Sequence, residues 1–383
     1  MRIVNRLAER FTPAKPLPEG IHHAQVAPQD KPPYRLHLRL RQDGTGILVV
    51  NAATVLQLNE TAAEYAYHFI KGTPPEETAK AIASRYQIGK GMALDDYLDF
   101  IGRIETLIET PDLDPVTFLD FERAAPHSAD LTAPLRLDCA LTYRLPAGAQ
   151  ADDAPAKRVD RELTTAEWQS VLDKAWQAGV PHVTFTGGEP TLRDDLPALI
   201  ARAEHNGQVC GLLTDGLKLA DKAYFDTLLQ TGLDHLLFVL HPENPASWAA
   251  LETVMPEDLF TTVHLTVTPR NAGQAAGTLD RLAGLKVTSL SLSASDESLG
   301  ETIHALRNTA ADLGLTLTFD LPVPYSGLNP VALETAEDEV PAGAGRAWLY
   351  VEPDGDVLPS QGMAERILGN ILRDEWQAIY PAR

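Results

Sequence analysis

The chain has 383 residues, of which 44% are hydrophobic and 22% charged, and its formal net charge is −21. A chain of this length can bury a large core and is expected to form two or three domains. The charge argues against a nucleic-acid partner, because phosphate binding needs clustered lysine and arginine. Two cysteines exclude a disulfide scaffold, and no apolar run approaches the roughly 18 residues of a membrane span. The amino terminus has no apolar signal segment, so we expect no membrane partner and a cytoplasmic protein.

The first third of the chain is predicted to be a tail followed by a small mixed domain over residues 34–109. Residues 1–33 are rich in proline and are interpreted as the tail. Asn59 is a good N-cap for the first helix of the domain. The domain is predicted to contain three strands, Tyr34–Leu40, Gly46–Asn51 and Thr54–Leu58, and three helices, Glu60–Lys71, Pro75–Tyr86 and Leu94–Glu109.

Two short runs of this domain resemble a known peptide-binding module. Leu58-Asn59-Glu60-Thr61-Ala62 and the later Lys71-Gly72-Thr73-Pro74-Pro75-Glu76-Glu77 are similar to PqqD-like chaperones, the recognition elements of ribosomally made, modified peptides (RiPPs). The resemblance implies a winged-helix fold in which a leader peptide adds to the edge of the third strand and packs on the third helix. Helical spacing of the apolar residues also fits a core-facing stripe, which is the alternative. The implied peptide-binding residues are Thr54, Val55, Leu56, Tyr97, Ile101 and Ile104.

The middle of the chain alternates short β-prone runs with helical stretches. Residues 110–132 are predicted to be a linker because they contain several prolines. Over residues 133–340, alternating strands and helices are typical of βαβ units and a parallel sheet. We therefore expect an α/β fold, a partial (β/α)6 TIM-like barrel. The predicted helices include Thr165–Ala178, Ala220–Thr231 and Leu299–Leu313.

A glycine pair lies between a predicted strand and a predicted helix. The run Thr186-Gly187-Gly188-Glu189-Pro190-Thr191 follows the apolar Val183-Thr184-Phe185 and resembles the turn of radical SAM enzymes that binds the amino group of S-adenosylmethionine. Paired glycines let the backbone approach a ligand closely. Thr214-Asp215-Gly216 is similar to the Thr-Asn-Gly that ends the family's third strand. The resemblance implies a vestigial cofactor-binding turn made of Gly187, Gly188, Glu189, Pro190, Thr214 and Asp215.

The cysteines of that family are missing. Residues 135–144 resemble the first barrel strand, which in the family leads into a Cys-x3-Cys-x2-Cys loop holding a [4Fe-4S] cluster. The three aligned ligand positions are Leu145, Ala149 and Asp152. Cys139 and Cys210 lie in predicted strands two spacings apart, roughly 9 to 10 Å, so we expect two buried free thiols. We therefore expect no metal site, no iron–sulfur cluster and no cofactor, with retained S-adenosylmethionine binding as the less favoured alternative.

Residues 341–383 resemble a remnant of a SPASM or twitch extension. In that extension a hairpin ends in a cysteine ligand and a Leu-Gly-Asn segment follows. Here Ala347–Ser360 contains a Pro-Asp-Gly turn, and Leu368-Gly369-Asn370 follows it. The cysteine position is Ser360. A generic hairpin followed by a helix is the alternative.

The pattern of retained folds and replaced ligands predicts a radical SAM-like pseudoenzyme, not a competent radical SAM enzyme by itself. We expect an accessory subunit that binds a precursor leader peptide and forms a heterodimer with an active radical SAM maturase in RiPP biosynthesis. Two alternatives stay open. The first is a cluster-free enzyme that uses S-adenosylmethionine or another small molecule for non-radical chemistry. The second is a structural or regulatory protein whose barrel is an interaction surface.

Overall fold

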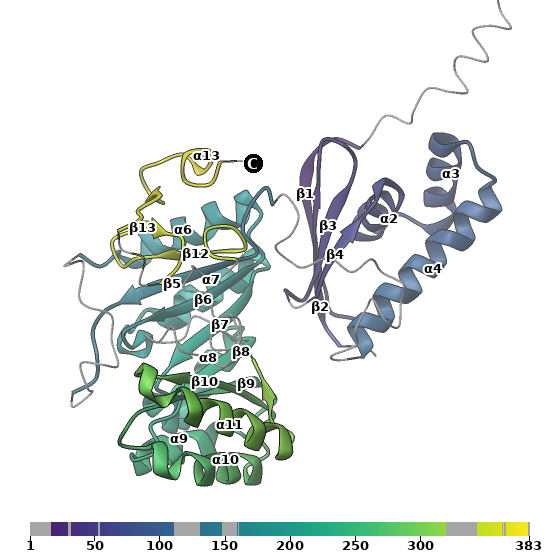
Figure 1. Ribbon diagram of the computed structural model, residues 1–383. Helices are drawn as coiled ribbons and strands as arrows, with labels where there is room; N and C mark the ends of the chain where they lie inside the picture. Colours follow the sequence, from purple (N-terminus) through teal and green to yellow (C-terminus); the bar gives the residue numbers. More distant parts are fainter. Residues whose placement is uncertain are drawn as a thin grey trace, which may run out of the picture. The chain divides into compact units, whose positions relative to one another are not determined.

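The structure is a computed structural model whose chain divides into two compact units, residues 1–129 and 130–383. Figure 1 shows its helices and strands. No helix in the described part of the chain is both long and apolar enough to cross a membrane. The described residues are 17–29, 32–52, 54–110, 131–147, 159, 161–318, 343–361, 363 and 365–381.

The first unit contains a four-stranded antiparallel sheet. Its strands are β1 (Gly20–Val26), β2 (Tyr34–Leu40), β3 (Gly46–Val50) and β4 (Thr54–Leu58), which lie in that order. The strand β1 falls inside the predicted tail and pairs with β2 over its whole length. Because β4 pairs only with β3 among the described strands, its other side is an edge of the sheet.

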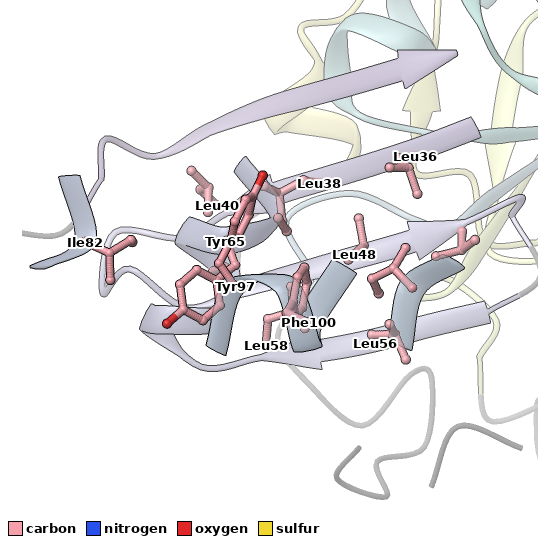
Figure 2. Close-up of a cluster of buried hydrophobic side chains, with 14 of the residues drawn as sticks. Leu36, Leu38, Leu40, Leu48, Leu56, Leu58, Tyr65, Ile82, Tyr97 and Phe100 are labelled. Carbon is pink, nitrogen blue, oxygen red and sulfur yellow. The ribbon is translucent and has the colours of Figure 1, made fainter. Parts of the chain in front are cut away.

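Three helices follow the strands and share one apolar core with the sheet. Asn59 caps the first of them as predicted, because its side-chain oxygen accepts the backbone N–H of Ala62 at 2.9 Å. Figure 2 shows side chains of the strands and of the third helix, among them Leu48 and Tyr97, gathered into one apolar cluster. The helices are α2 (Glu60–Ile70), α3 (Pro75–Tyr86) and α4 (Lys90–Glu109).

The second unit contains the expected partial (β/α)6 barrel, which confirms the predicted fold. Six parallel strands are hydrogen-bonded in chain order, and a short strand β11 (Thr316–Leu317) follows the sixth. Helices alternate with the strands (Figure 1). The strands are β5 (Arg136–Thr142), β6 (His182–Gly187), β7 (Val209–Thr214), β8 (His235–Val239), β9 (Phe260–Val267) and β10 (Ser289–Ala294). The helices are α6 (Thr165–Ala178), α7 (Leu196–Asn206), α8 (Lys222–Gln230), α9 (Pro245–Val254), α10 (Ala275–Gly284) and α11 (Gly300–Asp312).

The C-terminal segment extends the same sheet beyond β5. The strand β12 (Trp348–Val351) pairs in parallel with β5, and β13 (Asp356–Leu358) returns beside β12 as the predicted hairpin. A short strand, β14 (Gly369–Asn370), and a one-turn helix, α13 (Trp376–Ile379), complete the segment. The hairpin therefore lies next to the first barrel strand, a pairing that the sequence did not indicate.

The two cysteines are free and buried, as predicted. Cys139 lies on β5 and Cys210 on β7, with β6 between them. Burial raises the pKa of the Cys139 thiol well above its usual value. Both residues therefore act as small apolar side chains of the core.

Candidate functional site

The glycine-containing turn lies at the end of β6, where a short 3-10 helix (Pro190–Leu192) begins. The carboxylate of Glu189, which is 2% exposed, accepts four hydrogen bonds. Three come from the backbone N–H of Thr191 at 2.9 Å, the Thr191 hydroxyl at 2.5 Å and the Thr214 hydroxyl at 2.7 Å. The fourth comes from the backbone N–H of Asp215 at 2.8 Å. Glu189 thus joins the ends of β6 and β7, which brings the predicted residues of both strand ends together.

The surroundings of Glu189 also change the pKa of its carboxyl group. Burial raises its pKa to about 7, the nearby Asp215 carboxylate adds to the rise, and the hydrogen bonds oppose it. Asp215 is half-buried, and its side chain accepts the backbone N–H of Leu217 at 2.9 Å. The site therefore holds two adjacent carboxyl groups, one of which gains or loses its proton near neutral pH.

The two glycines are required by protein backbone that lies against them. The N–H of Gly188 donates to the Thr142 carbonyl at 2.6 Å, and that of Glu189 donates to the Arg144 carbonyl at 2.8 Å. A Cβ on Gly187, where φ is +133°, would lie 2.1 Å from the Thr142 oxygen, and one on Gly188 would lie 2.2 Å from the Arg144 oxygen. The sequence suggested close approach of a ligand as the reason for the pair. In the structure the close neighbour is the segment that follows β5.

Charged residues that the sequence analysis missed hold this segment in place. Arg193, 7% exposed, donates from Nη1 to the carbonyls of Leu141 at 3.2 Å and Leu163 at 3.0 Å, and it is paired with Asp195 at 2.6 Å. Glu162 pairs with Arg144 at 3.2 Å and accepts the Thr142 hydroxyl. The only signal in the sequence is an Arg-x-Asp directly after the turn. Its partners are distant along the chain.

The four replaced ligand positions are not all described by the structure. Leu145 is half-buried after β5, and Ser360 accepts a hydrogen bond from Trp348 Nε1 at 3.5 Å. Ala149 and Asp152 lie outside the described residues. Within the described ranges, no three His, Cys, Asp or Glu side chains are grouped so that they could hold a metal ion.

The predicted peptide groove divides into accessible and buried residues. Thr54 and Val55 of β4 and Ile101 of α4 are partly exposed. The other three, Leu56, Tyr97 and Ile104, are 2%, 1% and 0% exposed and belong to the apolar core of the unit. Their assignment to the groove is corrected here, because side chains enclosed by the core offer no surface to a peptide.

Comparison with known proteins identifies the middle of the chain. Residues 139–241 match the family model of the radical SAM superfamily. A PqqA peptide cyclase of Xanthomonas oryzae pv. oryzae is 28% identical over 270 residues, which cover 62% of this chain and 70% of that protein. A PqqA peptide cyclase of Streptomyces rochei is 29% identical over 252 residues, which cover 59% and 69%.

A solved structure has the same fold over nearly the whole chain. Streptococcus suis SuiB bound to S-adenosylmethionine superposes with a TM-score of 0.59 at 16% identity, covering 91% of this chain and 88% of SuiB. SuiB bound to its precursor peptide SuiA gives a TM-score of 0.59 at 15% identity, with 93% and 88% covered. At this identity the likeness establishes the fold alone.

These findings contradict the prediction that the chain has no cofactor and no iron–sulfur cluster. That prediction was based on four matched positions, whereas the radical SAM family model matches about a hundred residues around the turn. The fold is also one that has been solved with S-adenosylmethionine bound in SuiB. Residues 139–241 therefore match the radical SAM superfamily, and the chain is similar to PqqA peptide cyclases and has the fold of SuiB.

Proposed function

We propose that the chain is a radical SAM-like pseudoenzyme that serves as an accessory subunit in RiPP biosynthesis. In this role it binds a ribosomal precursor peptide and pairs with an active radical SAM maturase. One observation carries the proposal: a domain homologous to PqqA peptide cyclases has Leu145, Ala149 and Asp152 where the family has cysteines. In this arrangement the active maturase is the subunit that starts the radical chemistry.

The turn Gly187–Pro190 is the proposed site for S-adenosylmethionine. This ligand supplies a reactive sulfonium, together with ammonium and carboxylate groups by which it is held. Glu189 is fully engaged within the protein, so the backbone of the turn is the part left to contact the ligand. Asp215 places a second carboxyl group beside the turn. Negative charge there favours the ammonium of the ligand.

The first unit is the proposed peptide module, of the PqqD-like kind. The edge of β4 has no strand partner among the described residues, so a peptide can add to it as a further strand. Beside the core stripe of α4, Leu94, Leu98 and Ile101 are spaced at i, i+4 and i+7, and Leu98 is 48% exposed. This set replaces the buried Tyr97 and Ile104 as the apolar contacts of the peptide.

The test is a tagged pull-down from the native host, in which mass spectrometry identifies both proteins and short peptides. We expect a radical SAM protein with a complete cysteine motif and a short ribosomal peptide. Recovery of neither would contradict the accessory role. In the double variant L98E/I101E, the peptide should be lost and the maturase retained. The matched control is Met92→Glu, because Met92 is 61% exposed on a different side of α4.

A further inference from the structure

We infer that Tyr143 is a positioning residue for the turn Gly187–Pro190, and that the C-terminal hairpin acts on the turn through Tyr143. The inference rests on the proposed role of the turn in binding S-adenosylmethionine. It assigns the hairpin β12–β13 a part in shaping that site. Two sets of contacts connect the hairpin with the turn, one made by the backbone around Tyr143 and one made by its side chain.

The backbone on both sides of Tyr143 holds the turn. The residue before it, Thr142, accepts the N–H of Gly188 at 2.6 Å, and the residue after it, Arg144, accepts the N–H of Glu189 at 2.8 Å. The absent Cβ atoms of both glycines would lie within 2.2 Å of these same carbonyl oxygens. Residues 142–144 and the turn are consequently in direct contact, with no space between them. A displacement of residues 142–144 must be followed by the turn or must break its hydrogen bonds.

The side chain of Tyr143 is held by the hairpin. Its hydroxyl donates to Oε1 of Glu352 at 3.1 Å and lies 3.3 Å from the hydroxyl of Tyr350. Its ring packs against the cluster of Ala140, Tyr350 and Leu358. Glu352 is 3% exposed, so its carboxylate needs a donor such as the Tyr143 hydroxyl.

The hairpin itself is fixed relative to the barrel. Tyr350 pairs with Asp138 of β5, and Val351 pairs with Cys139. The backbone N–H of Glu352 donates to the Asp356 carbonyl at 2.8 Å across the hairpin turn. Glu352 is therefore presented by a rigid element. The conformation of Tyr143, and with it that of the turn, depends on the C-terminal segment.

The experiment compares amide hydrogen exchange in the full chain and in three variants, without ligand. Tyr143→Phe removes the donor of this hydrogen bond and Glu352→Met removes its acceptor. Each variant tests the contact by itself if the other fails to fold. Tyr380→Phe is the matched control, because its hydroxyl donates to the Arg346 carbonyl at 2.9 Å in the same C-terminal segment. We expect the amides of Gly188 and Glu189 to exchange about tenfold faster in the first two variants and unchanged in the control. Exchange at the wild-type rate in both test variants would overturn the inference.

Titration with S-adenosylmethionine separates this inference from the proposed function. If the wild type binds the ligand, Tyr143→Phe should bind it several-fold more weakly, and equal affinity would overturn the inference. If the wild type does not bind it, the proposed ligand of the turn is wrong. The exchange comparison then still decides whether Tyr143 positions the turn.

Discussion

The two ends of the barrel are built from the same strands but hold different side chains. Where the strands end, Glu189 and Asp215 place carboxyl groups beside the turn Gly187–Pro190. Where the strands begin, Nε2 of His182 on β6 lies 2.7 Å from Nε2 of His235 on β8. The two rings meet across β7, where Gly211 leaves room for them. The starting end is therefore filled by protein side chains, whereas the carboxyl end, where sites form in other barrels, holds polar groups.

The two ends also respond to pH in opposite directions. Burial lowers the pKa of His235 to about 4 and that of His182 well below its usual value. In contrast, burial raises the pKa of Glu189 to about 7. Lowering the pH therefore destabilises the buried histidine pair, and raising the pH destabilises the buried Glu189.

The largest expected effect comes from closing the space at the carboxyl end. Gly187→Ala puts a Cβ 2.1 Å from the Thr142 oxygen at a positive φ, so we expect a loss of about 3 kcal/mol or more in the free energy of unfolding. Urea unfolding measures it. The control is Gly277→Ala in α10, where nothing lies within 4 Å of the new Cβ, and this variant should gain up to about 1 kcal/mol. Equal stabilities of the two variants would contradict the close packing.

Breaking the histidine pair at the starting end should have the next largest effect. His235→Ala leaves a cavity and removes the hydrogen-bond partner of His182, so we expect a loss of about 2 to 3 kcal/mol. His205→Ala, on the exposed side of α7, is the control and should change stability by less than about 0.5 kcal/mol. Thermal and urea unfolding of both variants check the difference.

The pH dependence of stability tests whether the two ends of the barrel respond to pH in opposite directions. The folded-state pKa values of His182 and His235, and of His264 at about 3, lie below the ordinary 6.5. The unfolded chain therefore binds more protons, and stability falls as pH drops from about 6.5 towards 4. Glu189 has a raised folded-state pKa, so its contribution is largest below about 4.5 and is lost as pH rises through 7.

Urea unfolding from pH 4 to pH 8 should resolve the two contributions. Glu189→Gln should remove the loss of stability at alkaline pH and leave the loss of stability at acidic pH unchanged. In His235→Gln, the free energy of unfolding should fall less steeply as the pH drops. If the free energy of unfolding falls equally steeply at acidic pH in the wild type and in His235→Gln, the histidine pair does not contribute to the pH dependence of stability.

The smallest expected effect is that of Asp215→Asn. This change removes the like charge beside Glu189, which should lower the pKa of Glu189 and stabilise the protein by up to about 1 kcal/mol at pH 8. At pH 5 the effect should be smaller, because Glu189 is then protonated. Asp280→Asn on the exposed side of α10 is the control, with equal effects at the two pH values. A larger gain at pH 5 than at pH 8 would reverse the proposed coupling.

Local patterns predicted the elements of this chain better than their contacts. The alternation of β-prone and helical runs identified the barrel, and the Pro-Asp-Gly turn identified the β12–β13 hairpin. The strand β1 was missed because few of its side chains are apolar and none is fully buried. The partnership of β12 with β5 was missed because it joins residues about 200 positions apart.

At the candidate site, too, the sequence predicted the local elements but not the contacts between them. The sequence placed Gly187 and Glu189 in one turn, but it could not tell that the backbone after β5, rather than a ligand, lies against the glycine. Helical spacing likewise could not distinguish a groove residue from a core residue, and Tyr97 proved to be core. His182 and His235 are separated by 53 positions, so no local pattern could join them.

The pairing of β12 with β5 also sets an order of events during synthesis. A ribosome makes the first barrel strand long before the strand that lies beside it, since about 200 residues separate them. Until β12 emerges, this side of β5 has no such partner for its backbone N–H and C=O groups. An open edge of this kind is a template for pairing with another chain. Nascent chains that stall before Trp348 should therefore be the form of this protein most dependent on chaperones.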